Sequence, residues 1–157
     1  MRSPNQKFWK KKKVLVTGHT GFKGGWLCVL LHMLGCEVSG LALKKAVSKN
    51  NFFQSVNLKK ILKYDFRQDI SDIKKLNKAV SKSKPEIIFH MAAQSSVIKS
   101  FEDSHNTVVS NILGTTNILE VIKLNKKIKC AILITTDKVY QNYKFRKFFN
   151  ENSQLGG

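Results

Sequence analysis

Residues 14–24 constrain the fold more than any other part of the chain. A short aliphatic run leads into three glycines, and an apolar segment with helical spacing follows directly. This order predicts a strand, a tight turn and a helix, with glycines that allow the turn and the close approach of a pyrophosphate. Unpaired N–H groups and the positive dipole end at such a helix start attract phosphate. The alternative is a plain turn of a parallel sheet, but the strand before and the helix after favour a dinucleotide-binding loop. Its expected residues are Gly18, His19, Thr20, Gly21, Phe22 and Gly24.

Charge and length limit the other functions open to the chain. Its 157 residues suffice for one domain with a hydrophobic core, and the net charge of +18 invites a nucleic-acid or anionic-membrane partner. However, the lysines are scattered in pairs over several segments and are not interleaved with aromatic residues that could stack on bases. We therefore expect a lysine-rich solvated surface, with no nucleic-acid and no membrane partner.

The cysteines and the apolar stretches indicate the cellular compartment of the protein. Cys28, Cys36 and Cys130 lie far apart, without metal-ligand spacing. An odd number of cysteines without a secretion signal predicts buried, reduced thiols, no metal site and a cytoplasmic protein. The longest apolar stretch, residues 24–34, is too short to span a bilayer.

Hydrophobic periodicity predicts alternating strands and helices. The expected strands are residues 14–17, 36–43, 61–66, 86–90 and 129–135, and the expected helices are residues 22–34, 72–81 and 106–124. We expect Asp69 or Ser71 to cap the second helix. Residues 44–58 are expected to form a loop that can contain a helical turn at residues 51–56. Residues 91–100 are expected to form another loop.

The same periodicity predicts which helical residues face the core. For the first helix these are Phe22, Trp26, Leu27, Leu30, Leu31 and Leu34. For the second helix they are Ile73, Leu76 and Val80, and for the third Val109, Ile112, Leu113, Leu119 and Ile122.

The alternation predicts an α/β fold over residues 1–157: a doubly wound, Rossmann-type parallel sheet of order 3-2-1-4-5, with helices on both faces. A ligand of such a sheet lies across the carboxyl ends of strands one and four. The loops at residues 18–24, 91–100 and 135–143 all fall on that edge.

The adenosine end of the expected site lacks the usual acid. A carboxylate that holds the ribose is expected about 20 residues past the glycines, but residues 41–45 read Leu-Ala-Leu-Lys-Lys. Lys44 and Lys45 could meet a ribose 2′-phosphate, which would favour NADP, or could be solvated loop lysines. Asp69 could accept from the adenine amino group while Ile70 covers the ring, or could simply cap a helix. On these residues alone, the choice between NAD and NADP stays open.

Two further loops contribute candidates. Ala92, Ala93 and Gln94 follow the fourth strand, where small residues let a cofactor lie against the backbone; the alternative is a merely tight loop. Thr135 ends the fifth strand, beside the expected nicotinamide position. An alcohol, a carboxyl and an amine follow within four residues, and such groups can serve proton transfer when burial tunes them. The candidate catalytic residues are thus Thr136, Asp137 and Lys138, with an ordinary strand-end turn as the alternative.

Four motifs together make the chain resemble the extended short-chain dehydrogenase/reductase superfamily of NAD-dependent epimerases and dehydratases. They are T-G-x-x-G-F-x-G from Thr17, H-M-A-A-Q from His90, N-x-x-G-T-x-N from Asn111 and T-T-D-K-V-Y from Thr135. Within the superfamily the chain is similar to nucleotide-sugar 4,6-dehydratases. Three features favour the branch that acts on CDP-glucose: Phe8-Trp9 before the first strand, the residues between the glycines of the loop at 18–24, and the lysine at position 138.

The resemblance implies a lyase of deoxysugar and lipopolysaccharide synthesis that converts CDP-glucose to CDP-4-keto-6-deoxyglucose by transient hydride transfer to NAD. It favours NAD as the cofactor and a nucleotide sugar as the substrate. By matching positions, Thr136 would bond the sugar 4-oxygen, and Asp137, with a raised pKa, would protonate the leaving hydroxyl. Lys138 stands where related dehydratases carry a base, a role that lysine fills only with a depressed pKa.

The resemblance also implies that the chain is the cofactor half of an enzyme. The family's catalytic tyrosine and lysine, four residues apart, are expected beyond Gly157, as is the sugar-binding domain. Tyr140 and Tyr143 precede that place, and Tyr140 has Lys144 four residues later but in the wrong element. We therefore expect no dehydratase activity from the 157 residues alone, and a homodimer at full length. The alternatives are another NAD-dependent nucleotide-sugar epimerase, reductase or dehydratase, and a non-catalytic dinucleotide-binding module.

Overall fold

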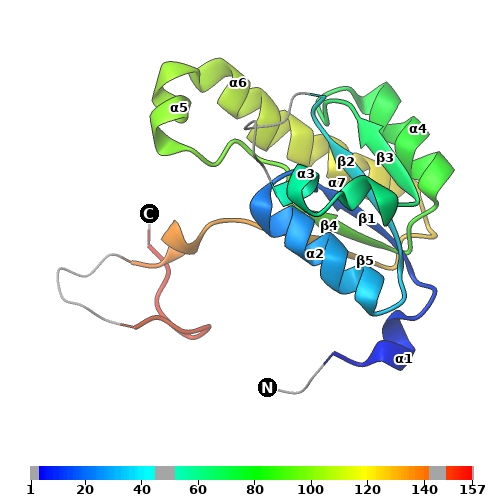
Figure 1. Cartoon of the computed structure of the whole chain (residues 1–157). Coiled ribbons are helices and arrows are strands. Elements are labelled where there is room, and N and C mark those ends of the chain that lie inside the picture. The colour runs from blue at the N-terminus through cyan, green and yellow to red at the C-terminus, as the bar shows by residue number, and fades with distance from the viewer. Residues whose placement is uncertain (1–3, 45–51, 142–147, 157) are drawn as a thin grey trace.

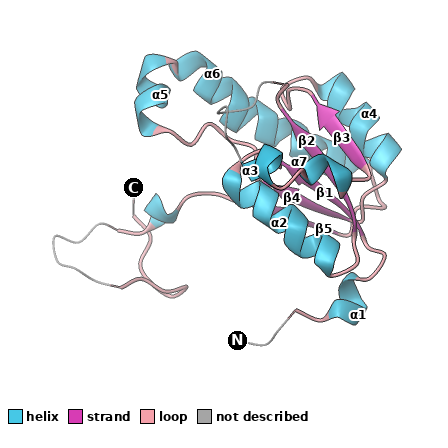
Figure 2. Cartoon of the chain, viewed as in Figure 1, coloured by secondary structure: helices cyan, strands magenta, loops and turns pink. Residues whose placement is uncertain are grey.

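A computed structural model describes residues 4–44, 52–141 and 148–156. Its centre is a parallel five-stranded sheet in the order β3-β2-β1-β4-β5, which confirms the predicted class and strand order (Figure 1, Figure 2). The strands are β1 (Lys13–Thr17), β2 (Glu37–Ala42), β3 (Tyr64–Arg67), β4 (Ile87–His90) and β5 (Cys130–Leu133).

Helices cover both faces of the sheet. One face carries α2 (Phe22–Met33) and α3 (Phe52–Ser55), and the other carries α4 (Ile73–Ser83) and α7 (Gly114–Leu124). Before β1 comes α1 (Gln6–Trp9), and α5 (Val97–Glu102) and α6 (Ser104–Val108) extend beyond the sheet (Figure 1). The remaining helical segments are short: the 3₁₀ turns η1 (Leu58–Lys60) and η3 (Asp137–Val139), and the π-helical η2 (Val109–Leu113) that joins α6 to α7.

The central strand shows why the sheet needs both helical layers. Val14 and Val16 of β1 pack in the cluster on the α2 side, and Leu15 packs in the cluster on the α4 and α7 side. All three are almost completely buried. A strand with two covered faces requires a continuous apolar run, which is what residues 14–16 supply.

Three local predictions were wrong. Strand β3 begins at Tyr64 rather than at residue 61, because the buried Leu58 starts a 3₁₀ turn that precedes it. The cap of α4 is Asp72, whose carboxylate accepts from Lys75 N at 3.0 Å, and neither Asp69 nor Ser71. Part of the expected loop at 91–100 is the helix α5, which Ser96 caps.

The predicted inner faces of two helices were only partly right: Leu31 is buried and Leu27 and Ile122 pack against the core, but other predicted residues are exposed. In η2 and α7, Ile112 and Leu119 are 62% and 50% exposed, while Asn117, Ile118 and Val121 are buried. Leu113 is exposed too, and in α2 the same holds for Phe22, Trp26 and Leu30, whereas the glycines, Cys28 and Leu31 are buried. Apolar residues lie on several sides of these helices, so periodicity does not select one face. In α2 the buried side carries Gly24, Gly25 and Cys28, whose small side chains allow close approach to the sheet.

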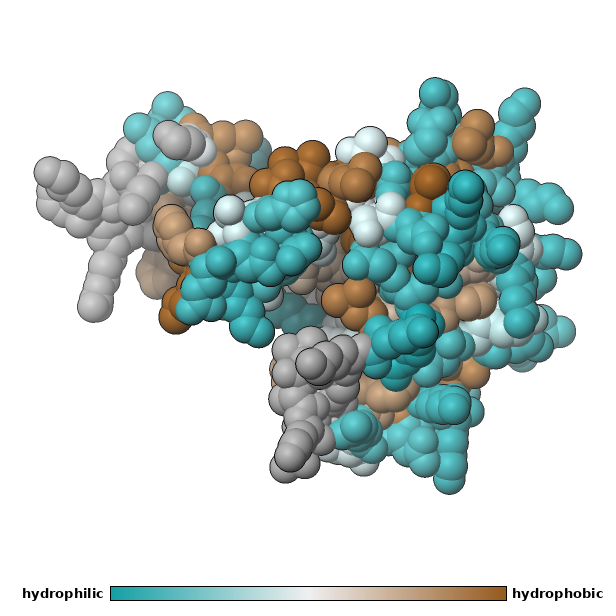
Figure 3. Space-filling view, turned by 90° about the horizontal axis from the view of Figure 1, so that it is seen from above, coloured by the Kyte–Doolittle hydropathy of each residue, from teal (hydrophilic) through white to brown (hydrophobic). Residues whose placement is uncertain are grey.

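Helix α4 shows the opposite case. Leu76 and Val80 are buried as predicted, and its outer side is rich in lysine. Seen from above, the end of the molecule where α4 and β3 lie is mostly hydrophilic, whereas apolar side chains gather over the middle (Figure 3). A single apolar side makes the face unambiguous.

The cysteines are free, as predicted, but not all are buried. Burial raises the pKa of the Cys28 thiol to about 12 and that of Cys36 to about 11. Cys130 is exposed, because β5 is an edge strand, and its expected burial was wrong. None of the helices formed by residues 4–44, 52–141 and 148–156 has the length and apolar character of a membrane span.

Candidate functional site

The glycine loop lies at the carboxyl edge of the sheet, between β1 and α2. Gly18 has φ +73°, a left-handed backbone that follows directly after β1. A Cβ atom at Gly18 would lie 2.8 Å from Met91 O and 2.9 Å from Ala92 N. The loop after β1 therefore touches the loop after β4, so the predicted convergence of these two loops is real.

The three glycines of the loop have three different surroundings. Gly18 makes the turn; a Cβ atom at Gly24 would collide with the carbonyl oxygen of Gly18, so Gly24 permits the close packing of α2. At Gly21 a Cβ atom would meet only Gly18 O, at 3.3 Å, and is otherwise in open space. Turn, bare backbone and close packing are the tasks that a dinucleotide-binding loop divides among its glycines.

The start of α2 offers donors to an anion. Gly21 is the N-cap residue of this 12-residue helix and makes no side-chain capping hydrogen bond. Its bare backbone, beside the positive end of the helix dipole, fits a pyrophosphate. The residues present therefore fit a dinucleotide at this place.

One hydroxyl group ties the two loops together. Thr17 Oγ1 accepts from the backbone N–H groups of Met91 and Ala92, each at 3.1 Å, and lies 2.8 Å from His90 Nδ1. A hydroxyl has two lone pairs and one proton. Because the two N–H groups occupy the lone pairs, the proton of Thr17 is donated to His90 Nδ1.

That donation determines the protonation of His90. Its Nδ1 is an acceptor, so the ring is neutral and carries its proton on Nε2, which donates to Thr115 Oγ1 at 2.9 Å. The side chain is almost completely buried, and burial lowers the pKa of His90 below its usual value. The result is a continuous chain of hydrogen bonds from β1 through β4 to α7.

The helical stretch η2–α7 fixes the remaining loop backbone. Asn111 Oδ1 accepts from Gln94 N at 2.7 Å, and Asn111 Nδ2 donates to Gln94 O at 3.0 Å. Asn117 Nδ2 donates to the carbonyl oxygens of Ile70 and Ser71, at 3.0 and 2.8 Å. This stretch thus holds both the loop after β4 and the loop after β3.

A charged cluster lies below the glycine loop, toward β3. The fully buried His19 ring lies against Gly40 of β2, and its Nε2 is 2.9 Å from Asp65 Oδ1. Arg67 Nε lies 2.8 Å from the same oxygen, and the Arg67 guanidinium stacks 4.4 Å from the centre of the Phe53 ring. Although burial raises the pKa of Asp65, hydrogen bonds from His19 and Arg67 outweigh it and lower the pKa below its usual value. Asp65 is therefore ionised.

The other residues that were predicted to bind the cofactor differ in their solvent exposure. Asp69 is exposed and accepts from Ser71 N at 2.9 Å, whereas Ile70 is 4% exposed and packs in the core against Gly114. Thr20 is buried, Phe22 is exposed, Ala92 and Gln94 are half-buried and Ala93 is exposed. Lys44 is exposed, and Lys45 lies outside the described residues.

The predicted catalytic residues follow β5 on the same edge. Thr135, Thr136 and Lys138 are exposed, and Thr136 Oγ1 accepts from Lys138 N at 3.2 Å, which caps η3. The side chain of Asp137 lies outside the description. Ile134 N donates to His90 O, so this segment is anchored to the end of β4.

Several residues of the site received no role from the sequence. Thr17, Asn111, Thr115 and Asn117 all stood inside the recognised motifs, yet only their spacing was visible. Their partners lie up to 75 residues away in the chain. His90 was expected to have a packing or hydrogen-bonding role, and its bonds to Thr17 and Thr115 confirm this. The sequence gave no sign that Asp65 and Arg67 have a role in the site, because polar and apolar residues ordinarily alternate along a strand.

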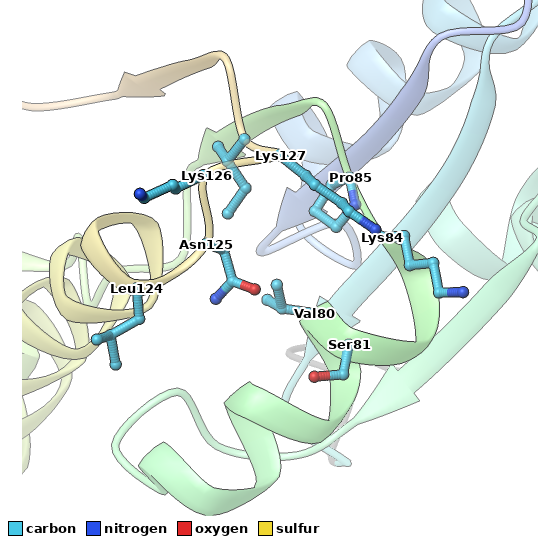
Figure 4. Close-up of a pocket in the computed structure, with 9 residues that line it drawn as sticks. Val80, Ser81, Lys84, Pro85, Leu124, Asn125, Lys126 and Lys127 are labelled. Carbon is cyan, nitrogen blue, oxygen red and sulfur yellow. The ribbon is translucent and has the colours of Figure 1, made fainter.

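A hollow of about 440 Å³ lies at the other edge of the sheet, between the ends of α4 and α7 (Figure 4). Lys84, Lys126 and Lys127 line part of it, next to the residues that lead into β4 and β5. Dinucleotides bind at the carboxyl ends of strands. This hollow is therefore no part of the candidate site.

Comparisons with known proteins agree with the geometry. A family model described as GDP-mannose 4,6 dehydratase matches residues 15–156. The CDP-glucose 4,6-dehydratase of Salmonella typhimurium is 40% identical over 153 residues, which are 98% of this chain and 42% of that protein. The dTDP-D-glucose 4,6-dehydratase of Dictyostelium discoideum is 34% identical over 130 residues, covering 82% of this chain and 30% of that protein.

A solved structure shares the fold. The UDP-glucose 4-epimerase of Thermus thermophilus, in complex with NAD, superposes with a TM-score of 0.76 at 29% identity, covering 91% of this chain and 44% of that chain. The present chain thus spans less than half the length of each of these relatives.

Proposed function

Because the chain belongs to the NAD-dependent epimerase/dehydratase family of extended short-chain dehydrogenases/reductases, we propose that it is the cofactor-binding part of a CDP-glucose 4,6-dehydratase. The observation that carries the proposal is the bare glycine cradle, fixed by the Thr17–His90–Thr115 hydrogen bonds at the carboxyl edge of the sheet. The 40% identity to the Salmonella typhimurium enzyme over nearly the whole chain supports CDP-glucose as the substrate.

We assign the cofactor to the edge formed by β1, β4 and their loops. The backbone of Gly21 and the first turn of α2 would hold the pyrophosphate, and Asp69 would accept from the adenine amino group. Gly18 and the loop from Ala92 to Gln94 would flank the chain of the cofactor, with Thr135 beside its nicotinamide. A bound NAD would supply reversible oxidation at carbon 4 of the sugar.

The residues after β5 would act on the sugar. Thr136 would donate a hydrogen bond to the 4-oxygen, and Asp137 would protonate the hydroxyl that leaves from carbon 6. Lys138 would occupy the position of the base that removes the proton at carbon 5. The sugar domain and the catalytic tyrosine and lysine are proposed to belong to the part of such an enzyme that these 157 residues do not span.

A chimaera tests this proposal directly. Residues 1–156 are joined to the part of the Salmonella typhimurium enzyme that follows the matched region, and the product of CDP-glucose is examined by mass spectrometry for the loss of one water. We expect the chimaera to form the 4-keto product and the 157-residue chain alone to form none. A chimaera carrying Thr136→Val is the matched control and is expected to be at least about tenfold slower.

Other outcomes would contradict parts of the proposal. Turnover by the 157-residue chain alone would show that it is no cofactor half. A chimaera that binds NAD⁺ but converts dTDP-glucose or GDP-mannose in preference to CDP-glucose would overturn the substrate. A folded chain that binds no dinucleotide would overturn the function altogether.

We also propose that the full-length protein is a homodimer. Val108, Ile112 and Leu119 leave an exposed apolar side on α6, η2 and α7 that a second copy could cover. Light scattering of the chimaera measures its mass, and replacing Ile112 and Leu119 together by glutamate is expected to yield monomers. An unchanged dimer would exclude this face.

A further inference from the structure

We propose that the outer side of α2 is a docking surface for an anionic lipid bilayer. The inference goes beyond the proposed function, because it concerns a surface outside the cofactor site and does not depend on a bound dinucleotide. It departs from the expectation of no membrane partner, which rested on the scatter of lysines along the sequence. In the folded chain, several of these lysines lie around one row of exposed apolar side chains.

This row of apolar side chains, the α2 stripe, runs along the whole outer side of the helix and consists of Phe22, Trp26, Leu30 and Met33. Phe22 and Met33 are each 70% exposed, and the other two are about half exposed. Steps of four, four and three residues place the four side chains on one side of a helix. Exposed apolar residues gathered in this way mark a surface that binds another apolar surface.

Aromatic contacts hold the ring of Trp26 in place. Phe52 of α3, which lies beside α2 in Figure 1, stacks on Trp26 with 4.6 Å between the ring centres. The same ring meets Phe22 edge-on at 5.9 Å. Trp and Phe side chains are favoured at the boundary between lipid headgroups and acyl chains. Since Phe52 covers one face of Trp26, and Leu30 and Met33 have no ring, the stripe is no stacking platform for nucleic-acid bases.

The charges in this part of the chain are almost all positive. Residues 1–64 contain 13 of the 28 lysines and arginines but one of the ten acidic residues, Glu37. That carboxylate lies at the start of β2, where Lys63 pairs with it at 3.7 Å. Helices α2 and α3 and the turn η1 therefore present cations without any carboxylate of their own.

These cations lie at both ends of the α2 stripe and beside it. Lys23 is exposed next to Phe22, and Lys11, also exposed, donates its N–H to Gly35 O at 2.8 Å just beyond the other end of α2. Beside the helix, η1 packs its Leu58 into the same core cluster as α2 and carries two exposed lysines, Lys59 and Lys60. An apolar row with cations around it complements a bilayer that carries negative headgroups.

Charge also distinguishes this surface from the apolar side of α6, η2 and α7. That side has carboxylates nearby, Glu102 and Asp103 before α6 and Glu120 on α7, so two copies of the chain can pair opposite charges there. Two copies of the α2 surface would bring only cations together, which disfavours self-association. An anionic bilayer is the occupant that the charges favour.

The connections of the sheet direct further chain to the other face. The crossover from β1 to β2 puts α2 on one face, and the crossover from β4 to β5 puts α7 on the opposite face. Because crossovers between parallel strands are right-handed, a helix that led from β5 to a further strand at that edge would lie on the face of α7. Such a helix would leave the α2 stripe uncovered.

The first experiment is co-sedimentation of the 157-residue chain with vesicles at low ionic strength. One set of vesicles is phosphatidylcholine alone, and the other contains equal parts of phosphatidylcholine and phosphatidylglycerol. We expect binding to the anionic vesicles to be at least about tenfold tighter, and most of it to be lost at about 1 M salt. A folded chain that binds neither set would overturn the inference and leave the proposed function standing, since titration with NAD⁺ tests that function separately.

Fluorescence shows whether the α2 stripe itself meets the lipid. The chain has two tryptophans, and Trp9→Phe leaves Trp26 as the sole emitter while keeping a ring near Phe89. We expect its emission to shift to shorter wavelength on anionic vesicles and to be quenched by lipids with brominated acyl chains. A bound chain with unchanged Trp26 emission would show that lysines alone attach it, and would overturn the docking surface.

A pair of substitutions in the α2 stripe provides the matched comparison. Leu30→Gln together with Met33→Gln removes two exposed apolar side chains and leaves the aromatic contacts intact. We expect binding to anionic vesicles to weaken about tenfold or more. Ile98→Gln with Leu124→Gln removes two equally exposed side chains from α5 and α7 and is expected to change it less than about twofold. Equal losses in both pairs would contradict the inference.

A second pair tests the charges. Lys23→Gln with Lys59→Gln is expected to weaken binding to anionic vesicles by about fivefold or more. Lys74→Gln with Lys78→Gln removes two exposed charges from α4, on the other face of the sheet, and is expected to have less than about half of that effect. Equal effects would reduce the binding to net charge and overturn the assignment to α2.

Self-association is the remaining outcome. Light scattering of the chain without vesicles measures its mass before and after Leu30→Gln with Met33→Gln. We expect the same mass for both. A dimer that this pair dissociates would show that a second copy occupies the α2 stripe, and the inference would be wrong.

Discussion

The two ends of the candidate site differ sharply in how they are built. At the glycine loop, Thr17, His90 and Thr115 form a buried chain of hydrogen bonds, and Gly18 packs against backbone. After β5, by contrast, Thr136 and Lys138 are exposed on an edge strand. The phosphate end is therefore preorganised by the chain's own core. The reaction end has its residues in order along the edge but is not enclosed by the described part of the chain.

The largest effect is expected at the phosphate end, from Gly18→Ala. The new Cβ atom would enter a left-handed backbone and lie within 2.9 Å of Met91 and Ala92 backbone atoms. We expect the free energy of unfolding, measured in urea, to fall by roughly 2–5 kcal/mol, and the affinity for NAD⁺ to fall at least about tenfold.

Gly35→Ala is its matched control. Gly35 also has a positive φ, +84°, but a Cβ atom there has ordinary contacts, 3.6 Å from Lys10. We expect a loss of about 1–2 kcal/mol from backbone strain alone and an unchanged NAD⁺ affinity. If the two variants lose equal stability, the contact between the loops has no energetic importance.

The second effect is expected from Thr17→Val, which keeps the shape and removes the hydroxyl. The N–H groups of Met91 and Ala92 and the ring of His90 all lose a buried partner. We expect the free energy of unfolding, measured in urea, to fall by about 2 kcal/mol and the affinity for NAD⁺ to weaken. Thr17→Ser keeps the oxygen and should stay close to wild type; equal losses in both variants would contradict the hydrogen-bond account.

A third, smaller effect concerns pH. In the folded protein, burial lowers the pKa of His90 below its ordinary value of 6.5. As the pH falls, His90 of the unfolded chain therefore takes up a proton before His90 of the folded protein does. The free energy of unfolding should therefore decrease below about pH 6.5, by at most about 1.4 kcal/mol per pH unit. Urea unfolding between about pH 5 and pH 7 measures this slope. In His90→Gln the contribution is absent, and identical slopes would show that His90 is not held neutral.

The smallest effect is expected at the reaction end, from Lys138→Ala. This side chain is exposed and its backbone N–H, which caps η3, is retained. Stability should change by less than about 0.5 kcal/mol and NAD⁺ affinity by less than about twofold. In the chimaera, the same change is expected to lower turnover. A large loss of stability would mean that the two ends are coupled.

Much of the fold could be predicted because its signals are local. The run at residues 14–16, the glycines that follow and the alternation of strands and helices lead to a parallel sheet of order 3-2-1-4-5. The inner faces of α2 and α7 were predicted only in part, because apolar residues lie on several sides of both helices. The cap of α4 was missed since Asp69, Ser71 and Asp72 compete within four residues, and local geometry selects one.

A strand, spaced glycines and a helix follow one another within residues 14–33, so the turn after the first strand is predictable from local sequence. What holds that turn in place depends on contacts between distant parts of the chain. Thr17 meets His90 and Ala92 across 73 and 75 residues, and Arg67 reaches the end of β2 from the neighbouring strand. Such contacts depend on which strands are neighbours and on which side of the sheet each residue faces, and no local pattern carries that information.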